Sequence, residues 1–188
     1  MIYLWVNPDI FPKGDMGIHD PQRSPDRFRF REAISLDKDL GTHVFRVNSV
    51  SKIIRKYDVL INNVQLPVVG PRALRLLMDI AGGDFQVFDA RVESKDGVVE
   101  GFKVLNIVQK VEAIDHSSSK YTYVAGTNVI AGFESLALRE NALGERNLAR
   151  DAEYLGNILV SERIQKAFEK EFIEGIRLVT PERYFGPK

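Results

Sequence analysis

The chain has 188 residues, of which 44% are hydrophobic and 28% charged, and its 26 basic and 26 acidic side chains leave no net charge. This balance argues against a general affinity for nucleic acid or for an anionic membrane. The absence of cysteine excludes disulfides, cysteine-ligated zinc, iron–sulfur clusters and thiol nucleophiles.

The length and the N-terminal residues set the expected organisation and location. A chain of this length fits a single domain over residues 1–188. No secretory signal is visible, and no apolar run approaches the ~20 residues that cross a bilayer. We therefore expect a cytoplasmic protein.

The N-terminal part combines a short strand with an irregular segment. Residues 2–6 are mostly β-branched or aromatic, which predicts a strand. Residues 7–31 contain four prolines, and proline fixes a backbone dihedral and removes a donor, so this segment is predicted to be an extended surface arm. The alternating arginines and phenylalanines at 27–31 fit an edge strand better than a basic–aromatic patch for nucleic acid. Further strands are predicted at 44–47 and 59–64.

Two helices are predicted, and each follows a short strand. Apolar residues at helical spacing indicate helices over Pro71–Ala81 and Glu162–Phe172, the second with Ser161 as its N-cap. The segments 68–77 and 159–168 align without a gap. This similarity fits either a duplicated strand–helix–strand unit or two uses of one common motif.

The stretch Gly101–Ser119 is predicted to lie in the middle of a sheet, as the hairpin partner of a strand at 85–92. Its side chains alternate between two faces, one formed by Phe102, Val104 and Asn106 and the other by Lys103, Leu105 and Ile107. With later strands predicted at 121–125, 133–138 and 157–160, the fold class is α+β. We expect a mostly antiparallel, curved sheet with two main helices.

The polar residues do not form a recognisable catalytic, cofactor or metal site. The three histidines lack the pair spacing of zinc ligands, and glycine-rich phosphate motifs are absent. Asp115-His116-Ser117 contains the residue types of a nucleophilic triad, but neighbouring side chains on extended backbone point apart. A turn in which the Asp115 carboxylate accepts backbone hydrogen bonds is favoured instead. Because no such motif is recognisable, we favour a protein that works by binding another macromolecule.

Local charge varies little along the chain. Residues 133–175 hold 6 basic and 9 acidic side chains, a small excess that could face a basic partner. A solvated surface is the simpler interpretation of this excess, and also of Glu169, Glu171 and Glu174 near the end of the second helix.

Short motifs occur in a characteristic order in the second and later parts of the chain. A proline–valine strand at 67–69 leads into the first helix, and Leu105-Asn106, Ile114-Asp115, Arg150, Val160-Ser161 and Gly175-Ile176 follow. In this order, residues 58–182 resemble the immunity-protein family of bacterial polymorphic-toxin systems, formerly a domain of unknown function and typified by a myxobacterial protein. The chain departs from the family pattern at Gly70-Pro71, where a serine is usual, and the arm at 7–31 has no match.

The resemblance implies a cytosolic protein, encoded beside a toxin, that binds this toxin and blocks it. The expected partner is a cognate toxin or effector protein, with no cofactor, nucleic acid or membrane involved. The positions matched to family motifs are Leu105, Asn106, Asp115, Arg150 and Ser161. We interpret Asn106 and Asp115 as fixing the sheet and its elbow, and we take the arm at 7–31 and the loop Arg139–Arg146 as candidate contacts with the toxin.

Two other functions remain open. A small hydrolase-type enzyme would use Asp115 and His116 with a distant carboxylate such as Asp89. An adaptor for a secreted effector would bind the delivery domain of the toxin without neutralising its toxic domain.

Overall fold

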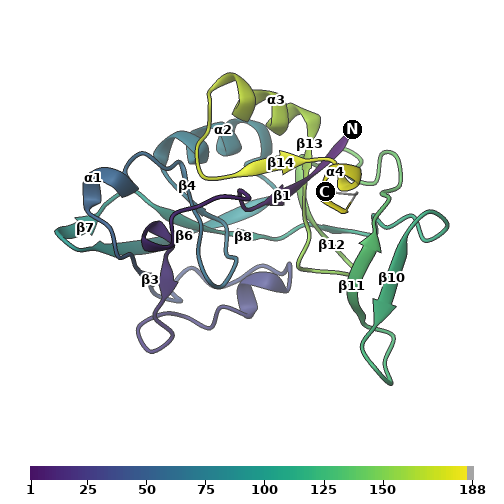
Figure 1. Ribbon diagram of the computed structural model, residues 1–188, viewed down its shortest axis with the longest axis horizontal. Coiled ribbons are helices and arrows are strands. Elements are labelled where there is room, and N and C mark those ends of the chain that lie inside the picture. Colours follow the sequence, from purple (N-terminus) through teal and green to yellow (C-terminus); the bar gives the residue numbers. More distant parts are fainter. Residues whose placement is uncertain (186–188) are drawn as a thin grey trace.

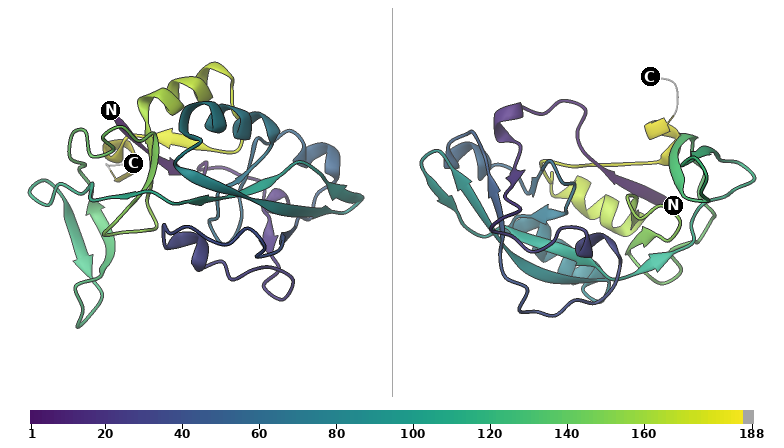
Figure 2. Two further views of the ribbon diagram at one scale, coloured as in Figure 1. Left: turned by 180° about the vertical axis from the view of Figure 1, so that it is seen from behind. Right: turned by 90° about the horizontal axis from the view of Figure 1, so that it is seen from below.

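The computed structural model describes residues 1–185 and shows a mixed α+β fold. Its strands curl into a half-barrel, with α2 and α3 packed side by side against it (Figures 1 and 2). The helices are α1 (Ser51–Ile54), α2 (Pro71–Ala81), α3 (Glu162–Lys170) and α4 (Pro181–Phe185), and two 3-10 turns are η1 (Lys13–Asp15) and η2 (Arg29–Arg31). The predicted fold class, with two main helices, is confirmed.

The larger sheet has seven strands in the order β2-β3-β6-β8-β5-β4, with β7 paired to β6. These strands are β2 (Ile18–His19), β3 (His43–Arg46), β4 (Val59–Leu60), β5 (Val68–Val69), β6 (Phe85–Ser94), β7 (Gly97–Val99) and β8 (Lys103–Ile107). All neighbours run antiparallel except β3 and β6. Strand β8 lies between β6 and β5, which confirms the predicted central position of this stretch.

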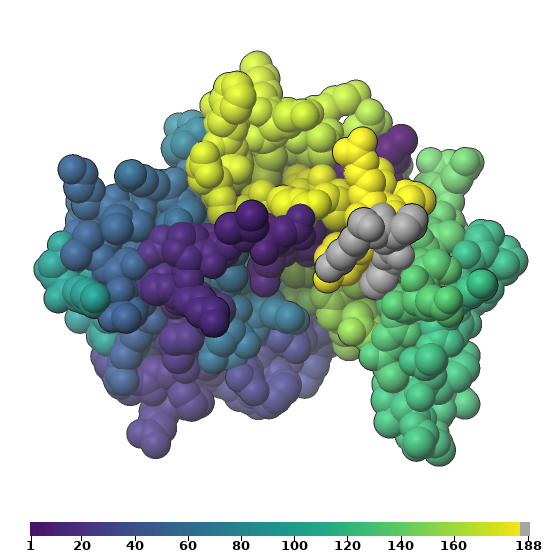
Figure 3. All heavy atoms as spheres, viewed as in Figure 1, coloured from purple at the N-terminus to yellow at the C-terminus, as the bar shows by residue number. Residues whose placement is uncertain are grey.

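The second sheet has five strands in the order β14-β1-β13-β12-β9, and only its β12–β9 pair is parallel. These strands are β1 (Ile2–Val6), β9 (Lys110–Val111), β12 (Leu148–Asp151), β13 (Ile158–Ser161) and β14 (Arg177–Val179). A separate hairpin of β10 (Lys120–Tyr123) and β11 (Ile130–Ser135) projects from the body (Figures 1 and 3). Its second strand begins earlier than the predicted strand at 133–138.

The two strand–helix–strand units share one topology. In the first unit, β5 and β6 flank β8 and run antiparallel to it. In the second unit, β13 and β14 flank β1 in the same way. Each helix therefore connects two parallel strands across a third, antiparallel strand. This shared topology fits the aligned sequences, and a common origin by duplication stays a prediction.

The alternation predicted for β8 separates two cores. Phe102 and Val104 join a cluster with Phe30 and Phe45 beneath the N-terminal segment. On the other face, Leu105 and Ile107 pack with the apolar faces of the two main helices, whose fully buried members are Ala73, Leu77 and Ile164. Alternating strand side chains thus supply both layers, as the period of two requires.

The end of α3 differs from the prediction. The helix stops at Lys170, and Phe172, predicted on its buried face, is 81% exposed. The Phe172 amide donates to the Glu169 carbonyl and the Ile173 amide donates to the Phe168 carbonyl, with Phe172 at φ +51°. This is the hydrogen-bond pattern of a Schellman motif, which turns the chain away from the helix axis.

The N-terminal arm is only partly the extended surface arm that the sequence predicts, because it contains η1 and β2, and β2 forms an edge of the larger sheet. Residues 29–31 form a 3-10 turn and no edge strand. Phe30 is fully buried and Phe11 packs on Tyr57, with ring centroids 4.9 Å apart. Ile10 and Phe28 are exposed. Of these four side chains, Phe11 and Phe30 therefore fix the arm to the body.

Candidate functional site

Leu105 and Asn106 are both fully buried in β8, where they contact other groups of the fold. Leu105 packs in the core against α2 and α3. The Asn106 side-chain amide donates to the Ile34 carbonyl at 2.8 Å and to Gln86 Oε1 at 2.9 Å. Gln86 Oε1 also accepts from the Leu36 amide at 2.8 Å. These contacts hold residues 34–36 against the sheet. The sequence predicts for Asn106 only that it fixes the sheet itself.

Arg150 lies in β12 and is buried, and no carboxylate of residues 1–185 forms an ion pair with it. Its guanidinium donates to the Leu155 carbonyl at 2.7 Å and to the Phe30 carbonyl at 3.2 Å. Burial, reinforced by the nearby Arg31 cation, lowers the pKa of Arg150 to about 10. Arg150 and Asn106 therefore both bind backbone carbonyls of the segment 30–34, from different strands.

The elbow at Asp115 has the predicted turn geometry. The Asp115 carboxylate accepts from the Ser117 amide at 3.0 Å and from the Ser117 hydroxyl at 2.6 Å. The hydroxyl contact, with smaller contributions from Ser118, lowers the pKa of Asp115. His116 instead meets the Tyr121 hydroxyl at 2.7 Å and the Glu153 carboxylate at 3.0 Å.

The residues considered for a hydrolase have separate contacts in the structure. Asp89, the distant carboxylate considered for that role, lies in β6 and pairs with Lys103 at 2.6 Å. Within residues 1–185, no group of three or more His, Cys, Asp or Glu side chains is placed to hold a metal ion. None of the helices in this range has the length and apolar character needed to traverse a bilayer.

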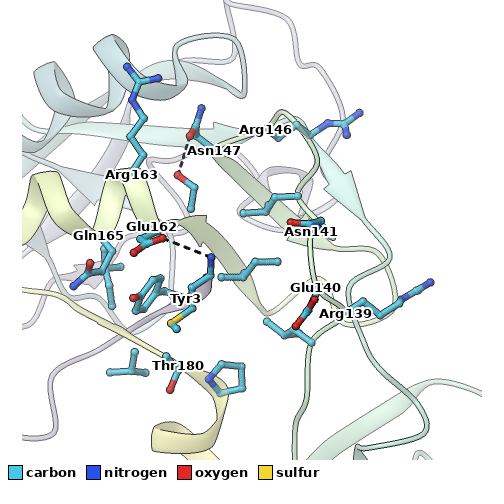
Figure 4. Close-up of a pocket in the computed structure, with 18 of the residues that line it drawn as sticks. Tyr3, Arg139, Glu140, Asn141, Arg146, Asn147, Glu162, Arg163, Gln165 and Thr180 are labelled. Carbon is cyan, nitrogen blue, oxygen red and sulfur yellow. Dashed lines mark hydrogen bonds and ion pairs between the residues drawn. The ribbon is translucent and has the colours of Figure 1, made fainter.

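A surface hollow with a volume of about 1160 Å³ forms where four segments meet (Figure 4). Its walls come from the start of β1, the loop 138–147, the first turn of α3 and residues 178–183. Figure 4 shows Tyr3 and Glu162 on one side and Glu140 and Asn141 on the other. Of the five family-motif residues, Ser161 alone lines this hollow.

Hydrogen bonds fix the loop of this hollow to the start of α3. The Ser161 hydroxyl accepts from the Ile164 amide at 3.4 Å as the predicted N-cap and donates to Asn147 Oδ1 at 2.8 Å. The backbone N–H of Asn147 in turn donates to the Asp84 carboxylate at 2.9 Å. Leu143, in the middle of the loop, is buried. The loop therefore has a fixed conformation, whereas the sequence predicted only that this segment is a loop.

The charges around the hollow have mixed signs. Glu162 pairs with Lys166 at 2.9 Å and with the N-terminal ammonium at 3.8 Å, and the Lys166 contact mainly lowers the pKa of Glu162. Arg146 donates to the Gln109 side chain at 3.0 Å, and its guanidinium points away from Tyr3 and Glu162 (Figure 4). Such a rim suits a protein surface, which offers both signs of charge, better than a single small ion.

Comparison with known proteins assigns the chain to a family. Residues 51–181 match the Immunity protein family (Imm11). The match contains α1 to α3, the loop 138–147 and all five family-motif residues, and it excludes β1, β2, β3 and the N-terminal arm. No curated protein matches the chain. Since the matched region covers more than half of the sequence, the chain belongs to the Imm11 immunity protein family.

Proposed function

We propose that this protein binds a cognate bacterial toxin in the cytosol and neutralises it by a stoichiometric protein–protein contact. The observation that supports this function is the family match over residues 51–181. The polar residues agree with it, because Asn106, Asp115 and Arg150 bind groups of the chain itself. In this proposal the protein acts as an inhibitor and catalyses no reaction.

The loop Arg139–Arg146 and the hollow beside it are the favoured part of the contact surface. They lie within the family match, whereas the arm at 7–31 lies outside it. A stable contact of standard size buries ~1,600 Å² in total, or ~800 Å² on each partner. The hollow with its neighbouring segments offers a pre-formed surface for such a contact, and pre-formed surfaces lose little conformational entropy on binding.

Co-expression with the toxin encoded by the adjacent gene tests the function. We expect cells that express the toxic domain to survive when this chain is present, and the two proteins to co-purify as a complex. In a titration of purified toxic domain, inhibition should be complete at about one molecule of inhibitor per toxin.

The titration separates the alternatives. Full protection at far fewer molecules of this chain than of toxin would indicate catalysis and contradict the proposal. His116→Ala should retain protection, because His116 contacts only groups of its own chain. Binding restricted to the delivery domain of the toxin, without loss of toxicity, would support the adaptor function instead.

A further inference from the structure

The surface at the C-terminal end of α3, formed by residues 168–178, contains an exposed aromatic side chain beside a hollow of mixed polarity. Phe172 is 81% exposed. It lines a hollow of about 370 Å³ together with Ile173 and Ile176. We call residues 168–178 the α3-end surface. An exposed large apolar side chain at a concave position is typical of protein contact sites.

The fold itself does not require phenylalanine at position 172. Phe172 occupies the residue after the helix cap, where the left-handed conformation, here φ +51°, usually selects glycine. A side chain with a Cβ atom is strained in this conformation. Phe172 also gains little from burial, because most of its surface faces solvent. Glycine at this position would satisfy the same backbone hydrogen bonds with less strain.

The segment that carries Phe172 is nevertheless held firmly. The Glu174 carbonyl accepts from the amides of Asp58 and Val59 at 3.0 and 2.9 Å. The Asp58 carboxylate accepts from the Glu174 amide at 3.1 Å. Arg72 donates to this carboxylate at 3.2 Å and to the Glu171 carbonyl at 2.5 Å. The aromatic ring is therefore presented on a pre-organised turn, which reduces the entropy lost on binding.

The charges around the ring indicate the chemistry of the partner. The two charged residues that line the hollow are both carboxylates, Glu169 and Glu174. Within residues 1–185, neither of them nor Glu171 forms an ion pair. Gln165 and Leu178 line both this hollow and the larger one at the start of α3, so the two form one continuous surface. A protein face with an apolar socket rimmed by lysine or arginine complements this arrangement.

We propose that Phe172 is the anchor of the toxin contact, inserting into an apolar socket of the toxin while Glu169, Glu171 and Glu174 face basic residues around that socket. The inference rests on the proposed function and adds the surface and the chemistry of the partner. It is an alternative to the simpler interpretation of these carboxylates as a solvated helix end.

Phe172→Gly and Phe172→Ala test the anchor. The probe is the toxic domain encoded by the adjacent gene, inactivated for purification, with binding measured by calorimetry. We expect both substitutions to weaken binding by about 30-fold or more, as for a central aromatic anchor. The melting temperature of Phe172→Gly should stay the same or rise by about 2–4 °C, because the strain is removed.

Two matched controls accompany these variants. Tyr123→Ala removes an exposed aromatic side chain of β10, in the hairpin that projects away from α3, and should leave binding unchanged (Figure 1). For the charges, Glu169→Lys with Glu174→Lys should slow association by about tenfold at low salt, and Lys170→Glu should accelerate it. These opposite effects from neighbouring positions distinguish charge complementarity from a change in folding.

The outcomes separate this inference from the proposed function. Failure of the unsubstituted protein to bind the toxic domain would overturn the proposed function and the anchor with it. Tight binding by the unsubstituted protein and equally tight binding by both Phe172 variants would overturn the anchor alone. The anchor would also be overturned if the melting temperature of Phe172→Gly fell more than about 4 °C below that of the unsubstituted protein. It would likewise be overturned if the variants only converted a dimer of this chain into monomers.

Discussion

Gly175 and Gly41 have almost the same backbone conformation in different surroundings, which makes them a matched pair for substitution by alanine. Their φ angles are +94° and +93°. A Cβ atom at Gly175 would lie 2.0 Å from the Val59 carbonyl oxygen, whereas a Cβ at Gly41 would have no neighbour within 4 Å. Both alanines would carry the same backbone strain, and only one would collide.

The difference between the two variants can be estimated from these contacts. The left-handed conformation costs an L-residue about 1–2 kcal/mol, which applies to both positions. At Gly175 the segment must also move away from β4, weakening the bonds from Asp58 and Val59 to the Glu174 carbonyl. Unmet buried backbone groups cost about 1–3 kcal/mol. We therefore expect a loss of about 2–5 kcal/mol for Gly175→Ala and about 1–2 kcal/mol for Gly41→Ala.

Urea unfolding followed by the fluorescence of Trp5, the single tryptophan, measures both losses. Trp5 is a suitable reporter because it packs on Phe168 at the end of α3, with ring centroids 5.9 Å apart. Equal losses at the two positions, within about 0.5 kcal/mol, would refute the reasoning, because they would show that the contact with Val59 does not constrain the segment.

Ser161→Ala is expected to remove the N-cap of α3 and cost about 1 kcal/mol, seen as a fall of about 2–4 °C in melting temperature. Acidification should destabilise the protein through His43, because burial and the neighbouring His19 lower the pKa of His43 from 6.5 to about 4 in the folded state. As the pH falls below 6.5, His43 is protonated in the unfolded chain before it is protonated in the folded protein. The free energy of unfolding should therefore fall by about 2 kcal/mol between pH 7 and pH 5. In urea titrations, His43→Phe should remove this part of the pH dependence. Arg150→Lys should cost about 1–3 kcal/mol, since one ammonium group cannot reach both carbonyls, and should speed hydrogen exchange in residues 29–36.

Much of the architecture could be predicted because its signals are local. The alternation of Phe102 to Ile107 has the period of a strand, and the structure confirms both faces. Proline at the first position defined the start of α2, and serine at the cap defined the start of α3. That the whole chain behaves as one domain stays a prediction.

The elements that sequence reasoning missed depend on distant contacts. Strand β12 was not predicted, because it ends in Arg150 and Asp151, which suggest a loop when read alone. Their polarity becomes compatible with burial only through partners such as the Phe30 and Leu155 carbonyls. At the end of α3, Phe172 falls four residues after Phe168 and extends the helical pattern, so the missing glycine concealed the turn.

The candidate surfaces were only partly accessible to prediction. The loop Arg139–Arg146 was identified as a candidate contact, but the hollow beside it is assembled from segments far apart in the sequence. The α3-end surface gave no short motif, since an apolar residue and three carboxylates also describe an ordinary helix end. Its particular feature is an exposed aromatic ring on a residue with a strained backbone, and only the structure reveals it.

The position of β1 has a consequence for how this protein is made. Ile2–Val6 is synthesised long before its two neighbours in the sheet, which are residues 158–161 and 177–179. The five-stranded sheet can therefore close only after residues 177–179 have been synthesised, and long-range pairing of this kind is slow. A nascent chain that stops before residue 158 would leave β1 without either of its partner strands.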